Sequence, residues 1–139
     1  MATTRRATAK WNGSLMEGSG AVTFESSELG TYPVTWAARS AEPAGVTSPE
    51  ELIAAAHATC FSMALSNGLA KAGTPPTQLN TSAEVDFVPG TGITEVRLTV
   101  SGDVPGLDAD GFAAAAANAK ENCPVSQALK AVPITLVVE

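Results

Sequence analysis

Two cysteines are the residues best suited to chemistry in this chain. Cys60 stands in an alanine-rich stretch, and His57 lies three positions before it, one turn away on the same face of a helix. Such a histidine could activate the thiol, bind a metal, or be a hydrogen-bonded residue of the core, and we favour the last. Cys60 is compatible both with a reactive thiol and with a small buried hydrophobe.

Cys123 directly precedes a proline that can open a new helical turn. A thiol at that position faces unpaired N–H groups and the positive end of a helix dipole, and both lower the pKa of a thiol. The alternative is an incidental cysteine at a helix break. The local surroundings favour reactivity at Cys123 more than at Cys60, but they do not say which thiol attacks first.

Two rival uses of these residues are weaker. His57, Cys60 and Cys123 are three candidate metal ligands, but the sequence has one histidine and no paired-ligand motif. Structural zinc usually takes four ligands. A Cys-His acyl transferase needs an oxyanion hole, and a nucleophile in the middle of a helix has no spare backbone N–H groups beside it.

A thiolate in an apolar pocket also needs a cation, because an unpaired charge is costly there. Arg39 suits that task, since arginine stays charged and presents a rigid fork of donors. Glu50 could fix such an arginine through a bidentate pair. The alternatives are a surface charge at a strand end for Arg39 and an acid that favours a helix start for Glu50.

The helices and strands that must position these residues are expected in the order βββ-α-ββ-α-β, which indicates an α+β fold. We expect residues 1–139 to form one domain. Strands come in clusters and do not alternate singly with helices, which distinguishes this fold from a doubly wound one. Strands are expected over residues 6–11, 20–26, 33–39, 79–88, 93–101 and 134–138, and helices over residues 49–72, 109–122 and 125–130.

The first of these helices has clear boundary signals. Ser48 is a typical N-cap, Pro49 suits the first helical position, and Glu51 completes a capping box. Gly73 ends the helix. Because residues 52–65 show no clear polar face, we expect this helix to be central and buried on most sides.

Composition limits the classes of partner. The net charge is −6, with no basic face, which disfavours nucleic acid and anionic membranes. Charged residues are 16% of the chain, a low share that hints at a homo-oligomer. Residues 1–10 have no apolar block typical of a secretory signal, so a cytoplasmic protein with reduced thiols is expected. The uncharged stretch 52–70 is expected to be a buried helix of a soluble protein.

Four motifs resemble the OsmC/Ohr family, and its OsmC branch in particular. They are TSPEELIAAAHATCFSMAL at 47–65, NCPVSQALK at 122–130, VPGLD at 104–108 and WNG at 11–13. They span nearly the whole chain in the right order. The resemblance implies an intertwined homodimer that acts as a thiol-dependent hydroperoxide reductase in oxidative or osmotic stress.

The resemblance also implies roles for individual residues. Cys60 matches the peroxidatic cysteine, Cys123 the resolving cysteine, and Glu50 the active-site acid. Arg39 matches the arginine of the OsmC branch, although Ser40 follows it where the family often has an aromatic residue. The implied chemistry is a Cys60 sulfenic acid, then a Cys60–Cys123 disulfide, then reduction by an external dithiol such as a lipoyl group. No metal, flavin or haem is required.

Helix geometry suggests how Glu50 reaches a cysteine. Ten residues separate Glu50 from Cys60, about 15 Å along a helix, so the two cannot meet within one straight helix. Two antiparallel helices that cross near the small residues 54–56 would bring them together. We therefore expect Cys60 and Cys123 of one subunit to work with Glu50, and with Arg39, of the other.

The apolar residues of the sequence also indicate the class of substrate in part. Leu52, Ile53, Phe61, Met63 and Phe112 can supply an apolar pocket wall, which favours organic hydroperoxides over hydrogen peroxide, although core packing is the alternative for most of them. The non-enzymatic alternative for the whole chain is a stress-induced binding or structural protein with inert thiols.

Overall fold

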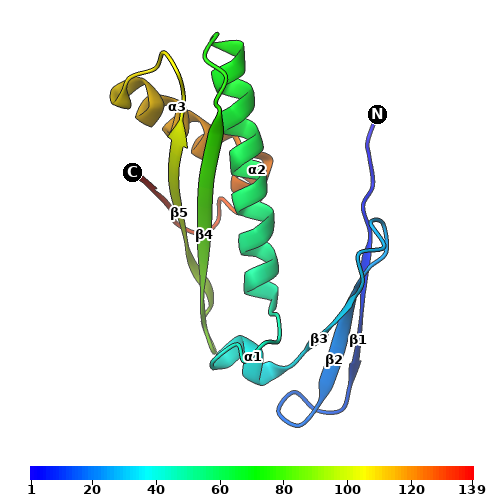
Figure 1. Cartoon of the computed structure of the whole chain (residues 1–139). Coiled ribbons are helices and arrows are strands. Elements are labelled where there is room, and N and C mark those ends of the chain that lie inside the picture. The colour runs from blue at the N-terminus through cyan, green and yellow to red at the C-terminus, as the bar shows by residue number, and fades with distance from the viewer. The chain divides into compact units, whose positions relative to one another are not determined.

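The computed structural model describes residues 1–139, and the chain divides into two compact units, residues 1–49 and residues 50–139 (Figure 1). Three strands are followed by two helices, two strands, two further helices and a last strand. The predicted α+β class with clustered strands is therefore confirmed. One domain over residues 1–139 stays a prediction.

The N-terminal unit is a three-stranded antiparallel sheet followed by a short helix. Its strands are β1 (Ala7–Asn12), β2 (Ser19–Phe24) and β3 (Thr31–Val34), in the order β1-β2-β3. The helix is α1 (Trp36–Ser40). Ala38 is the only buried side chain of this unit, so residues 1–49 form no substantial core of their own.

The strand predicted over residues 33–39 is wrong beyond Val34. The Oγ1 of Thr35 accepts a hydrogen bond of 3.1 Å from the N–H of Ala38, and this N-cap starts α1. Arg39 therefore lies in the last turn of a helix, half-buried, and not at the end of a strand.

The second unit contains a mixed sheet of order β4-β5-β6. The strands β4 (Gln78–Val88) and β5 (Gly92–Asp103) are antiparallel, whereas β6 (Ile134–Val138) is parallel to β5. A parallel pair needs a crossover, which α3 (Ala109–Asn122) and α4 (Pro124–Ala128) supply. The predicted bounds of α3 and β6 agree with the structure.

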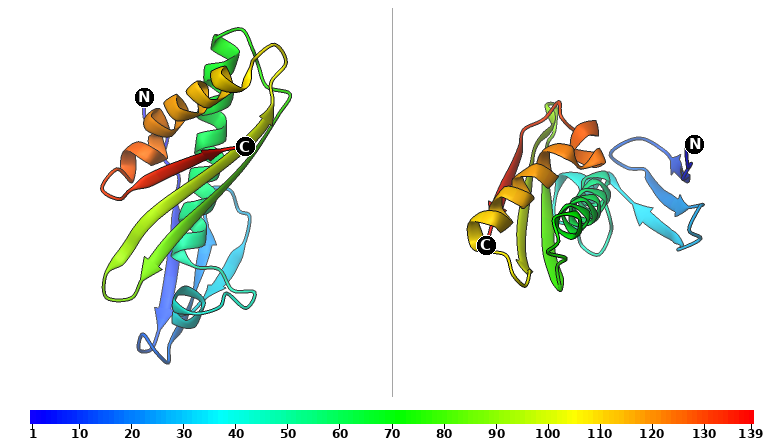
Figure 2. Two further views of the ribbon diagram at one scale, coloured as in Figure 1. Left: turned by 90° about the vertical axis from the view of Figure 1, so that its left-hand side faces the viewer. Right: turned by 90° about the horizontal axis from the view of Figure 1, so that it is seen from above.

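The long helix α2 (Pro49–Lys71) begins where the sequence predicts, with two glutamates in its first turn. It ends in a Schellman motif: Gly73 has a φ of 88°, its N–H bonds the carbonyl of Ala70, and the N–H of Thr74 bonds that of Leu69. The left view of Figure 2 looks onto the sheet, with α2 running behind it.

One stripe of α2 is buried, with its members four residues apart: His57, Phe61, Leu65 and Leu69. This spacing keeps side chains on one face of a helix. The apolar members pack in one core with residues of β5 and α3, which are Leu98, Val100, Phe112, Ala116 and Ala119. Cys123 belongs to the same core.

The expectation that α2 is buried on most sides is wrong for a single chain. Ala55, Ala56, Thr59 and Met63 are exposed, Met63 to 67%. By length and composition alone α2 could cross a membrane, a test that core helices of soluble proteins also pass. Its buried stripe makes it the core helix of this unit, so no membrane protein is implied.

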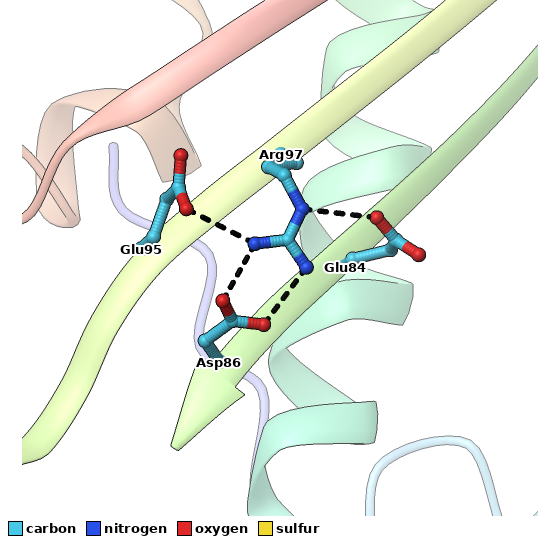
Figure 3. Close-up of polar contacts among 4 residues, drawn as sticks. All are labelled: Glu84, Asp86, Glu95 and Arg97. Atoms are coloured by element: carbon cyan, nitrogen blue, oxygen red, sulfur yellow. Dashed lines mark hydrogen bonds and ion pairs between the residues drawn. The ribbon is translucent and has the colours of Figure 1, made fainter. Parts of the chain in front are cut away.

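The sheet face opposite the core carries an ion-pair network (Figure 3). Arg97 on β5 donates to both oxygens of Asp86, at 2.6 and 2.8 Å. It also donates to Glu84 at 3.1 Å and to Glu95 at 3.0 Å. This cation holds the pKa of Asp86 below its ordinary value. The network joins β4 to β5 at the β-bulge between Asp86 and Phe87.

We expect Arg97→Met to lower the melting temperature at neutral pH, because three carboxylates then face one another without a cation. The pKa of Asp86 is depressed in the folded state, so its contribution is present above the unfolded value and is lost as pH falls through the folded value. The melting temperatures of variant and wild type should therefore converge in acid. Arg97→Lys, which keeps the charge but not the bidentate geometry, should be intermediate. Equal melting temperatures at neutral pH would contradict this account.

Candidate active site

The structure places the two cysteines side by side. Cys60 is half-buried in the middle of α2, and Cys123 is fully buried at the N-cap of α4, with Pro124 in the first helical position. Both thiols are free and close enough to interact, and Cys60 packs against the core cluster that contains Cys123. Two thiols in such contact need little movement to form a disulfide.

The surroundings of Cys60 act on its pKa in opposite directions. Burial raises the pKa of the Cys60 thiol above its ordinary value, and the contact with Cys123 raises it further. The N–H of Val125 donates a hydrogen bond to Cys60 and lowers this pKa, but burial outweighs it. A thiolate at Cys60 therefore needs further stabilisation beyond its contacts with Cys123 and Val125.

The Val125 contact corrects one part of the sequence argument. A nucleophile in the middle of a helix does lack spare N–H groups in its own helix. Cys60 nevertheless receives one from the first turn of α4. The unpaired N–H groups expected beside Cys123 thus include one that serves the other cysteine. Sequence spacing could not show this, because it does not reveal that α4 packs against α2.

The other two predicted site residues are Glu50 and Arg39. Glu50 is buried in the first turn of α2. Because Glu50 and Cys60 share one continuous helix, about 15 Å of helix axis separates them, as expected. Arg39 belongs to α1 of the N-terminal unit. Their roles at the site stay predictions.

His57 is the hydrogen-bonded core histidine favoured by the sequence. Its side chain is fully buried, and Nε2 lies 2.7 Å from Oγ of Ser126 on α4, which is buried too. Burial lowers the pKa of His57, so the ring is neutral. Sequence reasoning missed Ser126, although it follows Cys123 by the same three positions by which His57 precedes Cys60.

The remaining sequence predictions concern a metal site and the residues of an apolar pocket wall. No three His, Cys, Asp or Glu side chains lie close enough together to hold a metal ion. Phe61 is fully buried in the core, whereas Phe112 packs in the core and also lines a surface pocket beside Leu107. Leu52 and Ile53 are half-buried and Met63 is exposed, so these three are available to a substrate or to another chain.

An α+β chain with two free thiols in contact is a dithiol protein, in which oxidation of one cysteine can be completed by a disulfide with the other. The family model described as OsmC-like protein matches residues 42–137. Peroxiredoxin OsmC of Escherichia coli (strain K12) is 44% identical over 130 residues, which cover 91% of this chain and 90% of that protein. The chain therefore belongs to the OsmC-like protein family.

Solved structures agree with this assignment. An organic hydroperoxide resistance protein OsmC from Legionella pneumophila superposes with a TM-score of 0.75 at 26% identity, covering 99% of each chain. The organic hydroperoxide resistance protein OhrB of Bacillus subtilis gives a TM-score of 0.73 at 24% identity, covering 99% of this chain and 98% of that one. The second comparison concerns the fold alone.

Proposed function

We propose that this protein is a thiol-dependent peroxidase that reduces organic hydroperoxides, and hydrogen peroxide less well, in the cytoplasm. The observation that carries the proposal is the contact between the thiols of Cys60 and Cys123. Membership of the OsmC-like family and the names of its relatives support the same reaction.

The reaction divides into three steps. The Cys60 thiolate attacks the O–O bond of the hydroperoxide, takes one oxygen to become a sulfenic acid, and releases an alkoxide that is protonated to the alcohol. The Cys123 thiol then attacks the Cys60 sulfur, a disulfide forms, and water leaves. An external dithiol reduces the disulfide and is itself oxidised, which returns both thiols.

Arg39 is the cation that we assign to the Cys60 thiolate. Burial raises the pKa of Cys60, so a nearby positive charge is needed to keep a useful thiolate fraction at neutral pH. Arginine is always charged, and a carboxylate such as Glu50 can hold it in a fixed orientation. We therefore assign charge stabilisation to Arg39 and the orientation of Arg39 to Glu50.

We further propose that the working form is a homodimer with the active sites at the subunit interface. Two uncovered surfaces support it: the exposed face of α2 around Ala55 and Met63, and an N-terminal sheet with no core of its own. The strands of that sheet and the connections between them expose large apolar residues, which are Trp11, Leu15, Met16, Leu29 and Tyr32. A second copy that crosses α2 near Ala55 would bring its Glu50 towards Cys60.

Mixed dimers test this assignment. Cys60→Ser and Arg39→Met are each expected to be inactive alone, whereas co-expression of the two should restore about a quarter of wild-type activity, because half the dimers are mixed and each has one intact site. If Arg39 served the cysteine of its own chain, no mixed dimer would have an intact site. Activity no greater than that of the separate variants would contradict the shared site, and so would a fully active monomer.

The activity itself is tested by steady-state consumption of tert-butyl hydroperoxide by the reduced protein with a dithiol in excess. We expect consumption above the rate of the dithiol alone, and a higher kcat/KM for this hydroperoxide than for hydrogen peroxide. Thiols that do not react with either peroxide would instead favour a non-enzymatic binding or structural protein.

A further inference from the structure

The cysteine pair is accompanied by a second contact between the same two helices. His57 and Ser126 form a hydrogen bond of 2.7 Å from α2 to α4. His57 lies one helical turn before Cys60, and Ser126 lies one turn after Cys123. The bond and the thiol contact therefore stand side by side between α2 and α4, one turn apart.

The chemistry of this bond makes it costly to break. Both side chains are buried, His57 at 0% and Ser126 at 4% exposure, so neither can exchange the bond for one with bulk water. The Nδ1 of His57 is buried and has no hydrogen-bond partner in the chain. The ring therefore makes its single hydrogen bond to Ser126, and losing it would leave two buried nitrogens unsatisfied.

His57 does not act on Cys60 directly. A histidine beside a reactive thiol is commonly its base. Here the ring nitrogen that forms a bond turns to α4 and not to the thiol, so any effect of His57 on the cysteines passes through the helix contact.

We infer that His57 and Ser126 are positioning residues that hold α4 against α2 so that Cys123 stays within reach of Cys60. The contacts of Cys60 with Cys123 and with the N–H of Val125 hold α4 at one point along α2. A second contact one turn away fixes both the separation and the register of the two helices. Disulfide formation then requires little further ordering, which raises the effective concentration of one thiol at the other. The inference rests on the proposed function for its biological use but not for its test.

Glutathione buffers measure this effective concentration without any hydroperoxide. The oxidised fraction of the Cys60–Cys123 pair is determined by acid quenching, alkylation and mass spectrometry over a range of [GSH]²/[GSSG]. The midpoint is the value of [GSH]²/[GSSG] at which half of the pair is oxidised. We expect Ser126→Ala to lower this midpoint on the order of tenfold, since misplaced reacting groups lose effective concentration.

Ser62→Ala is the matched control. The hydroxyl of Ser62 also joins α2 to another element, through a bond of 2.8 Å to Thr81 on β4, but residues two positions apart on a helix, such as Cys60 and Ser62, do not face each other. Its midpoint should stay within about twofold of wild type, the ordinary outcome for a site that does not share partners with the pair. Equal shifts in Ser62→Ala and Ser126→Ala would overturn the inference, since they would indicate general loosening.

A double-mutant cycle completes the test. His57→Phe keeps a buried ring without nitrogens, and if both residues act through one bond, the double variant should shift the midpoint no further than Ser126→Ala does. An unchanged midpoint in Ser126→Ala, even with a lower melting temperature, would mean a structural role only and overturn the inference. A wild-type protein that forms the disulfide in glutathione but not with hydroperoxide would overturn the proposed function alone. Absence of the disulfide in every buffer would overturn both.

Discussion

Replacing Cys60 with serine is expected to reduce hydroperoxide consumption to the rate of the solution without protein. A serine hydroxyl is scarcely ionised at neutral pH, and its oxygen cannot be oxidised to a sulfenic acid, so neither the attack nor the storage of the oxygen atom remains. The measurement is steady-state consumption of an organic hydroperoxide with excess dithiol. The loss should be the same with every reductant, because the first step is missing.

The matched control for this variant is Lys71→Ala, at the exposed end of the same helix. It should retain wild-type activity. The substitution Cys60→Ser is nearly isosteric, so both variants should melt near the wild-type temperature. If Cys60→Ser kept a normal rate, Cys60 would not be the residue that attacks the peroxide.

Replacing Cys123 with serine should separate the first oxidation from turnover. Cys60 can still attack one hydroperoxide, but its sulfenic acid then has no resolving thiol. We expect the intact mass to rise by about 16 Da after one equivalent of hydroperoxide and by about 32 Da in excess, as the sulfenic acid is oxidised to the sulfinic acid. Turnover that depends on the disulfide should be lost.

The wild-type protein is the control for this over-oxidation. The contact between Cys60 and Cys123 lets the sulfenic acid close to a disulfide before a second peroxide reacts. Wild type should therefore resist excess hydroperoxide, whereas Cys123→Ser is inactivated by the sulfinic acid. Equal resistance of the two proteins would show that Cys123 does not resolve the sulfenic acid.

Local sequence signals predicted most helices and strands of this fold, because these elements begin and end close to the residues that carry the signals. Pro49 and Gly73 mark the ends of α2, and Asp108 caps α3, where its side chain accepts a bond from the N–H of Gly111. The strand predicted over residues 33–39 failed because one side chain, Thr35, caps a helix there. A threonine in a β-compatible run looks the same whether it pairs in a sheet or starts a helix.

The site was predictable only in part, for a different reason. Cys60 and Cys123 were found as candidates because thiols and their helix boundaries are visible in the sequence. Their contact, the N–H of Val125 and the bond from His57 to Ser126 depend on how α4 packs against α2. Spacing along the chain does not encode the packing of elements more than sixty residues apart.

The most direct test of the account is the intact mass of the reduced protein after one equivalent of an organic hydroperoxide, recorded under denaturing, non-reducing conditions. We predict the loss of two hydrogens in wild type, through a Cys60–Cys123 disulfide, and no such loss in Cys60→Ser or Cys123→Ser. An unchanged mass with both thiols still titratable would contradict the account, because the cysteines would then be inert towards hydroperoxide.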